Sequence, residues 1–153
     1  MKKTILITAL ILSGFAFNNI ISQVNVSLRV NIGSQPAWGP SGYDYVDYYY
    51  MPDIHTFYYV PRHQYIYQER GRWVFRSTLP SRFHYDVYSG YKVVINEPTP
   101  YRDAESYRRK YSSYRGHHDQ EIIRNSHDSK YYRIRGHPEY NNWRKNNRHR
   151  NGK

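Results

Sequence analysis

The chain has 153 residues, which is enough for one domain with a packed core after removal of a leader. It contains no cysteine, and this excludes disulfides, thiol catalysis and a lipid-modified N-terminal cysteine. Its 23 Lys and Arg residues outnumber 12 Asp and Glu, and the formal net charge of +11 favours anionic partners.

The N-terminal residues have the layout of a secretory signal peptide. Two lysines precede an almost uncharged apolar run from Ile5 to Phe17. This run is shorter than the ~20 apolar residues that a membrane-spanning helix needs. Cleavage after Ala16 and cleavage after Ser22 both have small residues at the required positions, and we divide the chain with the signal peptide at 1–22. The sequence therefore predicts an exported protein.

The mature chain begins with a predicted strand and a loop. Residues Val24 to Ile32, "VNVSLRVNI", alternate apolar and polar side chains, which is the pattern of a strand with one buried face. The following "GSQPAWGPSG" is rich in Gly, Pro and Ser, and this composition predicts a loop that carries Trp38.

A spacing of nine residues organises the next part of the chain. Tyr49, Tyr58 and Tyr67 align at this spacing, as do Pro52 and Pro61. Proline lacks the N–H that a sheet would use and fits the turns, while Tyr, Val, Ile, Phe and Trp between the turns favour strands. We predict an antiparallel meander of four strands near 45–51, 54–60, 63–68 and 72–77.

Pairing these strands through two-residue turns predicts the two faces of the sheet. The more apolar face, our predicted core face, carries Tyr48, Tyr50, His55, Phe57, Tyr59, Gln64, Ile66, Trp73 and Phe75. The other face carries Tyr49, Ile54, Thr56, Tyr58, His63, Tyr65, Tyr67, Arg72 and Val74. The dipeptides Pro-Asp and Pro-Arg suit type I turns rather than tight hairpin turns, so a bulge or a longer loop would exchange the faces.

A further strand and a helix follow the meander. "YKVVI", from Tyr91 to Ile95, is short, apolar and bounded by turn residues. The stretch "TPYRDAESYRRKYSSYRG" predicts a helix over 100–115, with Thr99 before Pro100 at its start and Gly116 at its end. One side of this helix carries Tyr101, Ala104, Tyr107, Tyr111 and Tyr114. We expect this stripe to dock on the sheet; presentation of the basic sides to a polyanion is the alternative.

The last part of the chain is strongly basic. From residue 99 onward there are fourteen Lys and Arg against six Asp and Glu, whereas residues 24–98 have seven against six. "YSSYRGHHD" and "YYRIRGHPE" form a degenerate repeat, and Asn-rich, basic sequence follows it. We predict a domain over 23–116 and a basic, partly disordered tail over 117–153, in which Tyr140 and Trp143 give one short helical contact.

Several motifs resemble those of a group of small exported tyrosine-rich proteins of Bacteroidota. They are "QPAWGPSGYDYVDYYYMPD", "YYVP", "GRWV", "LPSR" and "YKVVINEP", in this order. The matching residues include Pro36, Trp38, Gly39, Pro40, Tyr43, Tyr45, Pro52, Pro61, Trp73, Leu79, Pro80, Lys92 and Asn96. The resemblance covers roughly residues 23 to 100. It implies a periplasmic, outer-membrane-associated or secreted location in a Gram-negative bacterium, and it carries over no functional residue.

The sequence has no recognised motif for catalysis or for metal binding. His117 with Asp119 and His137 with Glu139 place imidazole beside carboxylate, yet their spacing matches no recognised metal-ligand motif. The sequence contains no G-x-S-x-G, S-x-x-K, H-E-x-x-H or Gly-rich phosphate loop. We therefore expect no metal, no cofactor and no enzymatic activity.

The fold class that these elements predict is α+β, mostly β: a small antiparallel meander packed by one amphipathic helix. The predicted function is binding of an anionic surface polymer or a partner protein, without sequence-specific nucleic-acid recognition. The cations expected to make this contact are Arg108, Arg109, Lys110, Arg115, Arg133, Arg135, Arg144, Arg148 and Arg150. The alternative is a glycan- or peptidoglycan-binding module in which Tyr58, Tyr65 and Tyr67 stack on sugar rings. The sequence predicts no oligomeric state.

Overall fold

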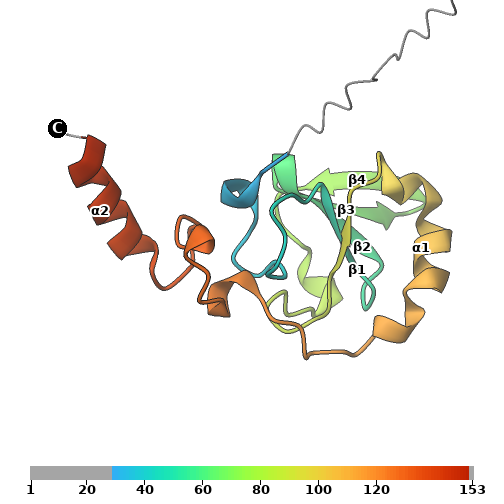
Figure 1. Ribbon diagram of the computed structural model, residues 1–153. Helices are drawn as coiled ribbons and strands as arrows, with labels where there is room; N and C mark the ends of the chain where they lie inside the picture. Colours follow the sequence, from blue (N-terminus) through green and yellow to red (C-terminus); the bar gives the residue numbers. More distant parts are fainter. Residues whose placement is uncertain (1–28, 152–153) are drawn as a thin grey trace, which may run out of the picture.

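The computed structural model describes residues 29–151 of the chain (Figure 1). The predicted signal peptide and most of the predicted strand 24–32 lie outside the described residues. In the part of that strand that is described, the prediction is wrong, because Ile32–Ser34 forms a 3-10 helix. The side chain of Asn31 accepts from the N–H of Val46 at 2.9 Å and donates to its carbonyl at 2.6 Å, and these bonds hold the chain against a loop instead of a strand.

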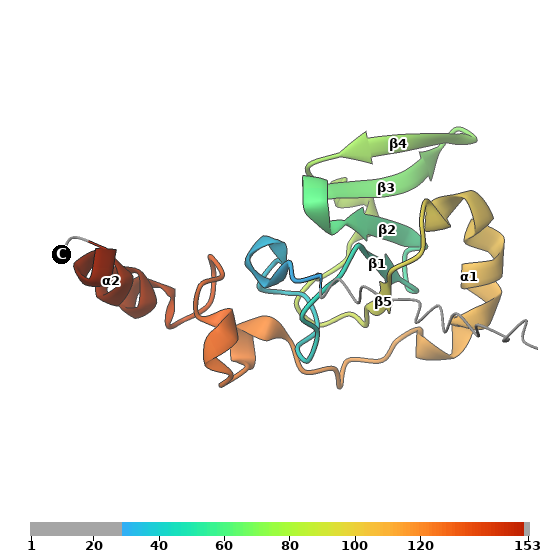
Figure 2. The same cartoon turned by 45° about the horizontal axis from the view of Figure 1, so that its top comes forward.

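A five-stranded antiparallel sheet forms the centre of the molecule, in the order β4-β3-β2-β1-β5 (Figure 2). The strands are β1 (Tyr48–Met51), β2 (Thr56–Tyr59), β3 (Gln64–Glu69), β4 (Arg72–Arg76) and β5 (Val93–Ile95). The predicted meander and the fifth strand are confirmed, with shorter strands than expected. Together with the helices that follow, the sheet makes the fold α+β.

The register of the meander confirms the predicted division of side chains between the two faces. Phe57 lies opposite both Tyr50 and Ile66, and Ile66 lies opposite Phe75. The loops 52–55 and 60–63 have four residues where we expected two. Because both numbers are even, the longer loops leave each side chain on its predicted face.

Both faces of the sheet are buried, whereas we expected one core face. On the predicted core face, Tyr107 of the helix α1 (Ala104–Lys110) packs on Tyr50 and Phe57, with ring centroids 6.0 and 5.6 Å apart. On the other face, the ring of Trp38 lies 5.6 Å from Tyr49 and 4.7 Å from Tyr58. The predicted loop around Trp38 therefore covers the face that we expected to be half exposed.

The predicted helix over 100–115 is divided into three short pieces. Pro100–Asp103 and Ser112–Tyr114 are 3-10 helices, and α1 lies between them. Thr99 adopts a left-handed conformation (φ 48°) and its side chain makes no capping hydrogen bond, so it does not act as the predicted cap. The tyrosine stripe docks on the sheet as expected.

Residues 117–137 pack on the body of the protein, which corrects the predicted loose tail. Ile122, Ile123, Tyr131, Ile134 and His137 are all buried. Ile123, Tyr131 and Ile134 form a small core with Ile32 and Ala37. The Tyr131 hydroxyl also accepts hydrogen bonds from two backbone N–H groups of residues 42 and 43, at 2.7 and 3.1 Å. Apolar side chains hidden among the charges thus anchor this segment.

Only the last helix, α2 (Tyr140–Asn151), extends away from the body (Figures 1 and 2). In both views it lies at the opposite end of the molecule from α1. Among the described residues, no helix is long and apolar enough to cross a membrane.

A side chain continues the hydrogen bonding of the sheet beside β5. The Oε1 of Gln120 accepts from the N–H of Lys92 at 3.0 Å, and its Nε2 donates to the carbonyl of Lys92 at 2.9 Å. Lys92 directly precedes β5, which is an edge strand. The amide of Gln120 therefore bonds this residue as the main chain of a neighbouring strand would.

Candidate functional site

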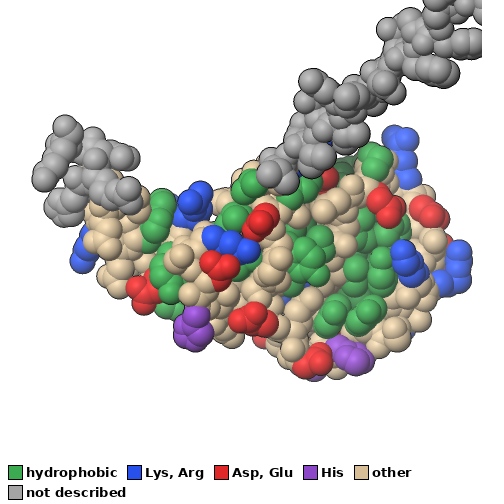
Figure 3. Space-filling view, in the orientation of Figure 1, with side chains coloured by type: hydrophobic (Ala, Val, Ile, Leu, Met, Phe, Trp, Pro, Cys, Tyr) green, Lys and Arg blue, Asp and Glu red, His purple; other side chains and the backbone are tan. Residues whose placement is uncertain are grey.

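The predicted polyanion-binding residues do not form one surface. Arg108, Arg109, Lys110 and Arg115 belong to α1 or follow it closely, whereas the C-terminal members belong to α2 or to the segment before it. These two groups lie at opposite ends of the molecule (Figure 1). On the face drawn in Figure 3, basic side chains are spread between the two ends, with acidic side chains among them.

Two cations of the α1 group already contact neighbouring side chains, and one of these neighbours is an acid. The guanidinium of Arg108 lies 3.8 Å from the carboxylate of Glu105, and the ammonium of Lys110 lies 5.1 Å from the ring centroid of Tyr111. An exposed pair such as Arg108 and Glu105 contributes little stability, but it places an acid within the group. This end of the molecule is therefore mixed in charge.

The C-terminal group has fewer acidic neighbours. Arg133, Arg135, Arg144 and Arg148 are exposed, and none of them forms an ion pair with another described residue. The guanidinium of Arg144 lies 5.7 Å from the ring centroid of Tyr140. The side chain of Arg150 lies outside the described part. At this end the cations remain open to an anionic ligand.

The tyrosines of the alternative glycan site are buried. Tyr58, Tyr65 and Tyr67 are 5, 8 and 4 % exposed. Burial raises the pKa of Tyr65 to about 12, which reflects the loss of water around its hydroxyl. A ring must be accessible to stack on a sugar. The expected exposure of these three rings is wrong, because Trp38 covers Tyr58 and Tyr65 and Phe83 packs on Tyr67.

The histidines that we considered as metal ligands are placed differently from one another. His117 is exposed, with its Nδ1 3.7 Å from a carboxylate oxygen of Asp119. The buried His137 uses both ring nitrogens: Nε2 lies 3.0 Å from the carbonyl of Ser126, and Nδ1 accepts from the N–H of Glu139 at 3.1 Å. Among the described residues, no group of three or more His, Asp or Glu side chains is arranged to hold a metal ion.

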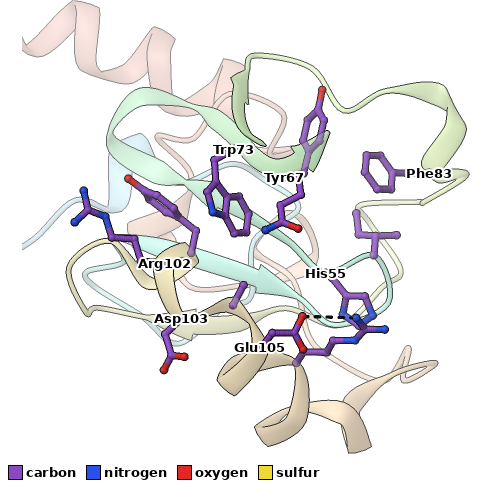
Figure 4. Close-up of a pocket in the computed structure, with 12 residues that line it drawn as sticks. His55, Tyr67, Trp73, Phe83, Arg102, Asp103 and Glu105 are labelled. Atoms are coloured by element: carbon purple, nitrogen blue, oxygen red, sulfur yellow. Dashed lines mark ion pairs between the residues drawn. The ribbon is translucent and has the colours of Figure 1, made fainter. Parts of the chain in front are cut away.

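A cavity of about 360 Å³ lies between the β3–β4 hairpin, α1 and the turn before β2 (Figure 4). The rings of Trp73 and Tyr101 form one wall, with their centroids 5.6 Å apart. The other lining residues are Ile54, His55, Tyr67, Gln68, Phe83, Arg102, Asp103, Ala104, Glu105 and Arg108. Aromatic and polar groups thus share one concave surface, as in many small-molecule sites.

The ionisable groups of this cavity are balanced in charge. Besides the pair of Arg108 and Glu105, the lining contains Arg102 and Asp103. Burial and the nearby arginines Arg108 and Arg115 lower the pKa of His55, so its ring is neutral near pH 7. The Nδ1 of His55 lies 3.2 Å from the hydroxyl of Tyr50, which fixes the orientation of the ring.

Lys92 is a cation within the core. It is 1 % exposed, and its Nζ is the only buried side-chain nitrogen or oxygen of the described residues that lacks a hydrogen-bond partner. The Nζ lies 5.9 Å from the ring centroid of Trp38. Burial lowers its pKa to about 8, and the carboxylates of Asp86 and Asp53 partly oppose this shift.

Sequence reasoning missed both the cavity and the buried cation. The cavity is built from residues that lie between 54 and 108 in the chain, and only the packing of α1 against the hairpin brings them together. Lys92 follows a turn and precedes an apolar run, which is also the pattern of an exposed residue at the start of a strand. Its place opposite Trp38 gave no signal in the sequence.

Comparison with models of protein families, with curated proteins and with solved structures finds no match for this chain. The resemblance to exported proteins of Bacteroidota therefore stays a prediction.

Proposed function

We propose that the protein is an exported, non-enzymatic protein of the cell envelope that binds an anionic polymer through its C-terminal basic segment. The observation that carries this proposal is the projection of α2 from the body, with Arg144, Lys145 and Arg148 exposed and without ion pairs among the described residues. Arg133 and Arg135 lie at the same end. Cations placed in this way release counterions when they meet a polyanion, and this release drives binding.

A polymer is favoured over a protein partner because the described part of α2 has little apolar surface. Its two large apolar side chains, Tyr140 and Trp143, stack on each other with centroids 6.2 Å apart. A protein interface usually has an apolar centre surrounded by polar residues. A helix of cations and amides with one stacked aromatic pair suits a flexible chain of negative charges better.

The α1 group is not part of the proposed contact. It lies at the other end of the molecule, and Glu105 stands among its cations. The proposal that the protein is exported rests on the signal-peptide pattern, and the proposal that it is not an enzyme rests on the lack of known catalytic motifs in the sequence.

The test compares two variants of equal charge in the mature chain. One variant carries Arg144→Ala, Lys145→Ala and Arg148→Ala, and the matched control carries the same three losses at Arg109, Lys110 and Arg115. Binding to dextran sulfate and to alginate is measured at low and moderate salt. We expect the α2 variant to bind more weakly, with a salt slope reduced by about one for each lost contact, and the control to change little.

Equal losses in the two variants would show that binding follows net charge alone and would refute a contact through α2. Binding that survives in both variants would also refute it. If the protein binds an envelope protein and neither polysaccharide, its ligand is a partner protein and the proposed polymer contact is wrong.

A further inference from the structure

We propose that the cavity between the β3–β4 hairpin and α1 binds one uncharged sugar ring. This cavity is the one drawn in Figure 4, lined by Trp73, Tyr101, Gln68, Glu105 and Arg108 among others. It lies at the α1 end of the molecule, away from α2, so the proposal does not depend on the polyanion contact.

Each ring of the aromatic wall of the cavity packs against another aromatic ring. Trp73 makes a T-shaped contact with the buried Phe57, with ring centroids 6.4 Å apart, and the exposed Phe75 makes one with Tyr101, with centroids 5.5 Å apart. Trp73 and Tyr101 themselves are only partly buried. A sugar ring has an apolar face of C–H groups, and an aromatic ring that is rigid and partly open is suited to stack on it.

Polar groups face the same space as the aromatic wall. Figure 4 shows Glu105 and His55 below Trp73, and its dashed line marks the ion pair between Glu105 and Arg108. Gln68 offers an amide from β3. A carboxylate accepts, a guanidinium donates and an amide does both, so together these groups match hydroxyls that both donate and accept.

The charge balance of the cavity favours a neutral ligand. Arg108 and Glu105 already lie 3.8 Å apart, and Arg102 and Asp103 stand side by side in the chain. An anion drawn to Arg108 meets the carboxylate of Glu105 beside it, and a cation drawn to Glu105 meets the guanidinium of Arg108. A ring of hydroxyls meets no like charge. With a volume of about 360 Å³, the cavity has room for one such ring.

The three tryptophans give separate reporters for this test. Trp38 lies in the core, Trp73 lines the cavity and Trp143 belongs to α2. Indole N–H signals of the mature chain are followed by NMR during titration with glucose, N-acetylglucosamine and their short neutral oligomers. The signals are assigned from the variants Trp73→Phe and Trp143→Phe. We expect sugar to shift the Trp73 signal and to leave the other two in place.

Substitutions of exposed lining residues complete the test. Glu105→Gln and Gln68→Ala are each expected to weaken sugar binding by about tenfold, whereas Glu139→Gln, at the far end of the chain, leaves it unchanged. Both lining side chains are exposed or nearly so, and folding of the variants is checked by the unchanged Trp38 signal.

Three results would overturn the proposal: no shift of Trp73 at sugar concentrations well above about 1 mM, a stronger response of Trp73 to phosphate or acetate than to sugars, or unchanged affinity in both lining variants. Titration with dextran sulfate should shift Trp143 and leave Trp73 in place. Failure of the sugar site and failure of the polyanion contact are therefore seen at different signals.

Discussion

Replacement of the core cation, Lys92→Met, is expected to stabilise the fold. The pKa of Lys92 is lowered from 10.5 to about 8 by burial. At 1.36 kcal/mol per unit of pKa, burying the charged form costs roughly 3 kcal/mol. Below about pH 8 the amine is protonated in both the folded and the unfolded chain, so the whole cost acts at pH 7. Methionine has a similar length, carries no charge and still packs against Trp38.

The pH dependence of this effect follows from the direction of the shift. Between about pH 8 and pH 10.5 the unfolded chain binds a proton that the folded chain does not, so the stability of the native protein rises with pH. The slope reaches at most about 1.4 kcal/mol per pH unit. The stability of the Lys92→Met variant does not rise in this way. The difference in stability between the variant and the native protein should therefore shrink steadily between about pH 8 and pH 10.5. Tyrosines whose pKa is raised by burial act in the opposite direction above pH 10, but equally in both proteins.

The assay is urea denaturation of the mature chain and the variant at about pH 7, 8 and 9, with Lys145→Met on the exposed side of α2 as the control. The control removes one positive charge that is exposed to water, so it avoids no cost of burying a charge. It is expected to change stability by less than about 0.5 kcal/mol. A Lys92→Met variant that is less stable than the native protein at pH 7, or whose advantage does not change with pH, would refute the reasoning.

Three further substitutions test how the chain is held together, each by the change in the free energy of unfolding. Tyr131→Phe leaves two backbone N–H groups without their acceptor and should cost about 1–3 kcal/mol, whereas Tyr132→Phe should cost less; equal costs would contradict the anchoring of residues 117–137. Gly90→Ala places a Cβ against the ring and hydroxyl of Tyr85 and should cost about 1–3 kcal/mol, whereas Gly33→Ala meets nothing closer than 3.9 Å and should be nearly neutral. Gln120→Ala removes both bonds to the main chain beside β5 and should cost about 1–3 kcal/mol; a neutral result would show that water replaces the amide.

The meander and its register could be predicted because they depend on local signals. Pro52 and Pro61 fix where the strands end, and alternation fixes which side chains share a face. The strands are shorter than predicted around both turns, because His55 and His63 adopt a left-handed conformation beside the Pro-Asp and Pro-Arg dipeptides, and only the dipeptides gave a turn signal in the sequence. The even length of both loops preserved the register.

The burial of the second face could not be read from the strands. The second face carries Tyr49, Tyr58 and Tyr65. A tyrosine-rich face does not indicate its own burial, because tyrosine is common both in cores and on half-exposed surfaces. What decides their burial is the loop that carries Trp38 and the segment 79–87, which lie outside the strands in sequence. Alternation alone indicates the sides of a sheet, not what covers them.

The anchoring of residues 117–137 was missed because the segment was judged by its high positive charge and not by its individual apolar residues. Ile123, Tyr131 and Ile134 are separated by polar residues without a helical or strand period. Each nevertheless inserts into the same small core. The same limitation applies to the sugar cavity, whose residues come from three separate elements and become neighbours only in the folded chain.

The amide of Gln120 also bears on how copies of this protein behave at high concentration. An edge strand with free N–H and C=O groups can pair with a strand of another chain. Contacts between aromatic side chains of the two sheets would stabilise this pairing. Here a side chain occupies the groups where an incoming strand would begin to pair, while Arg72 and Arg76 place charge on the opposite edge strand. Each edge strand of the sheet thus has a feature that hinders pairing with a strand of another copy: a side-chain amide beside β5 and two arginines on β4.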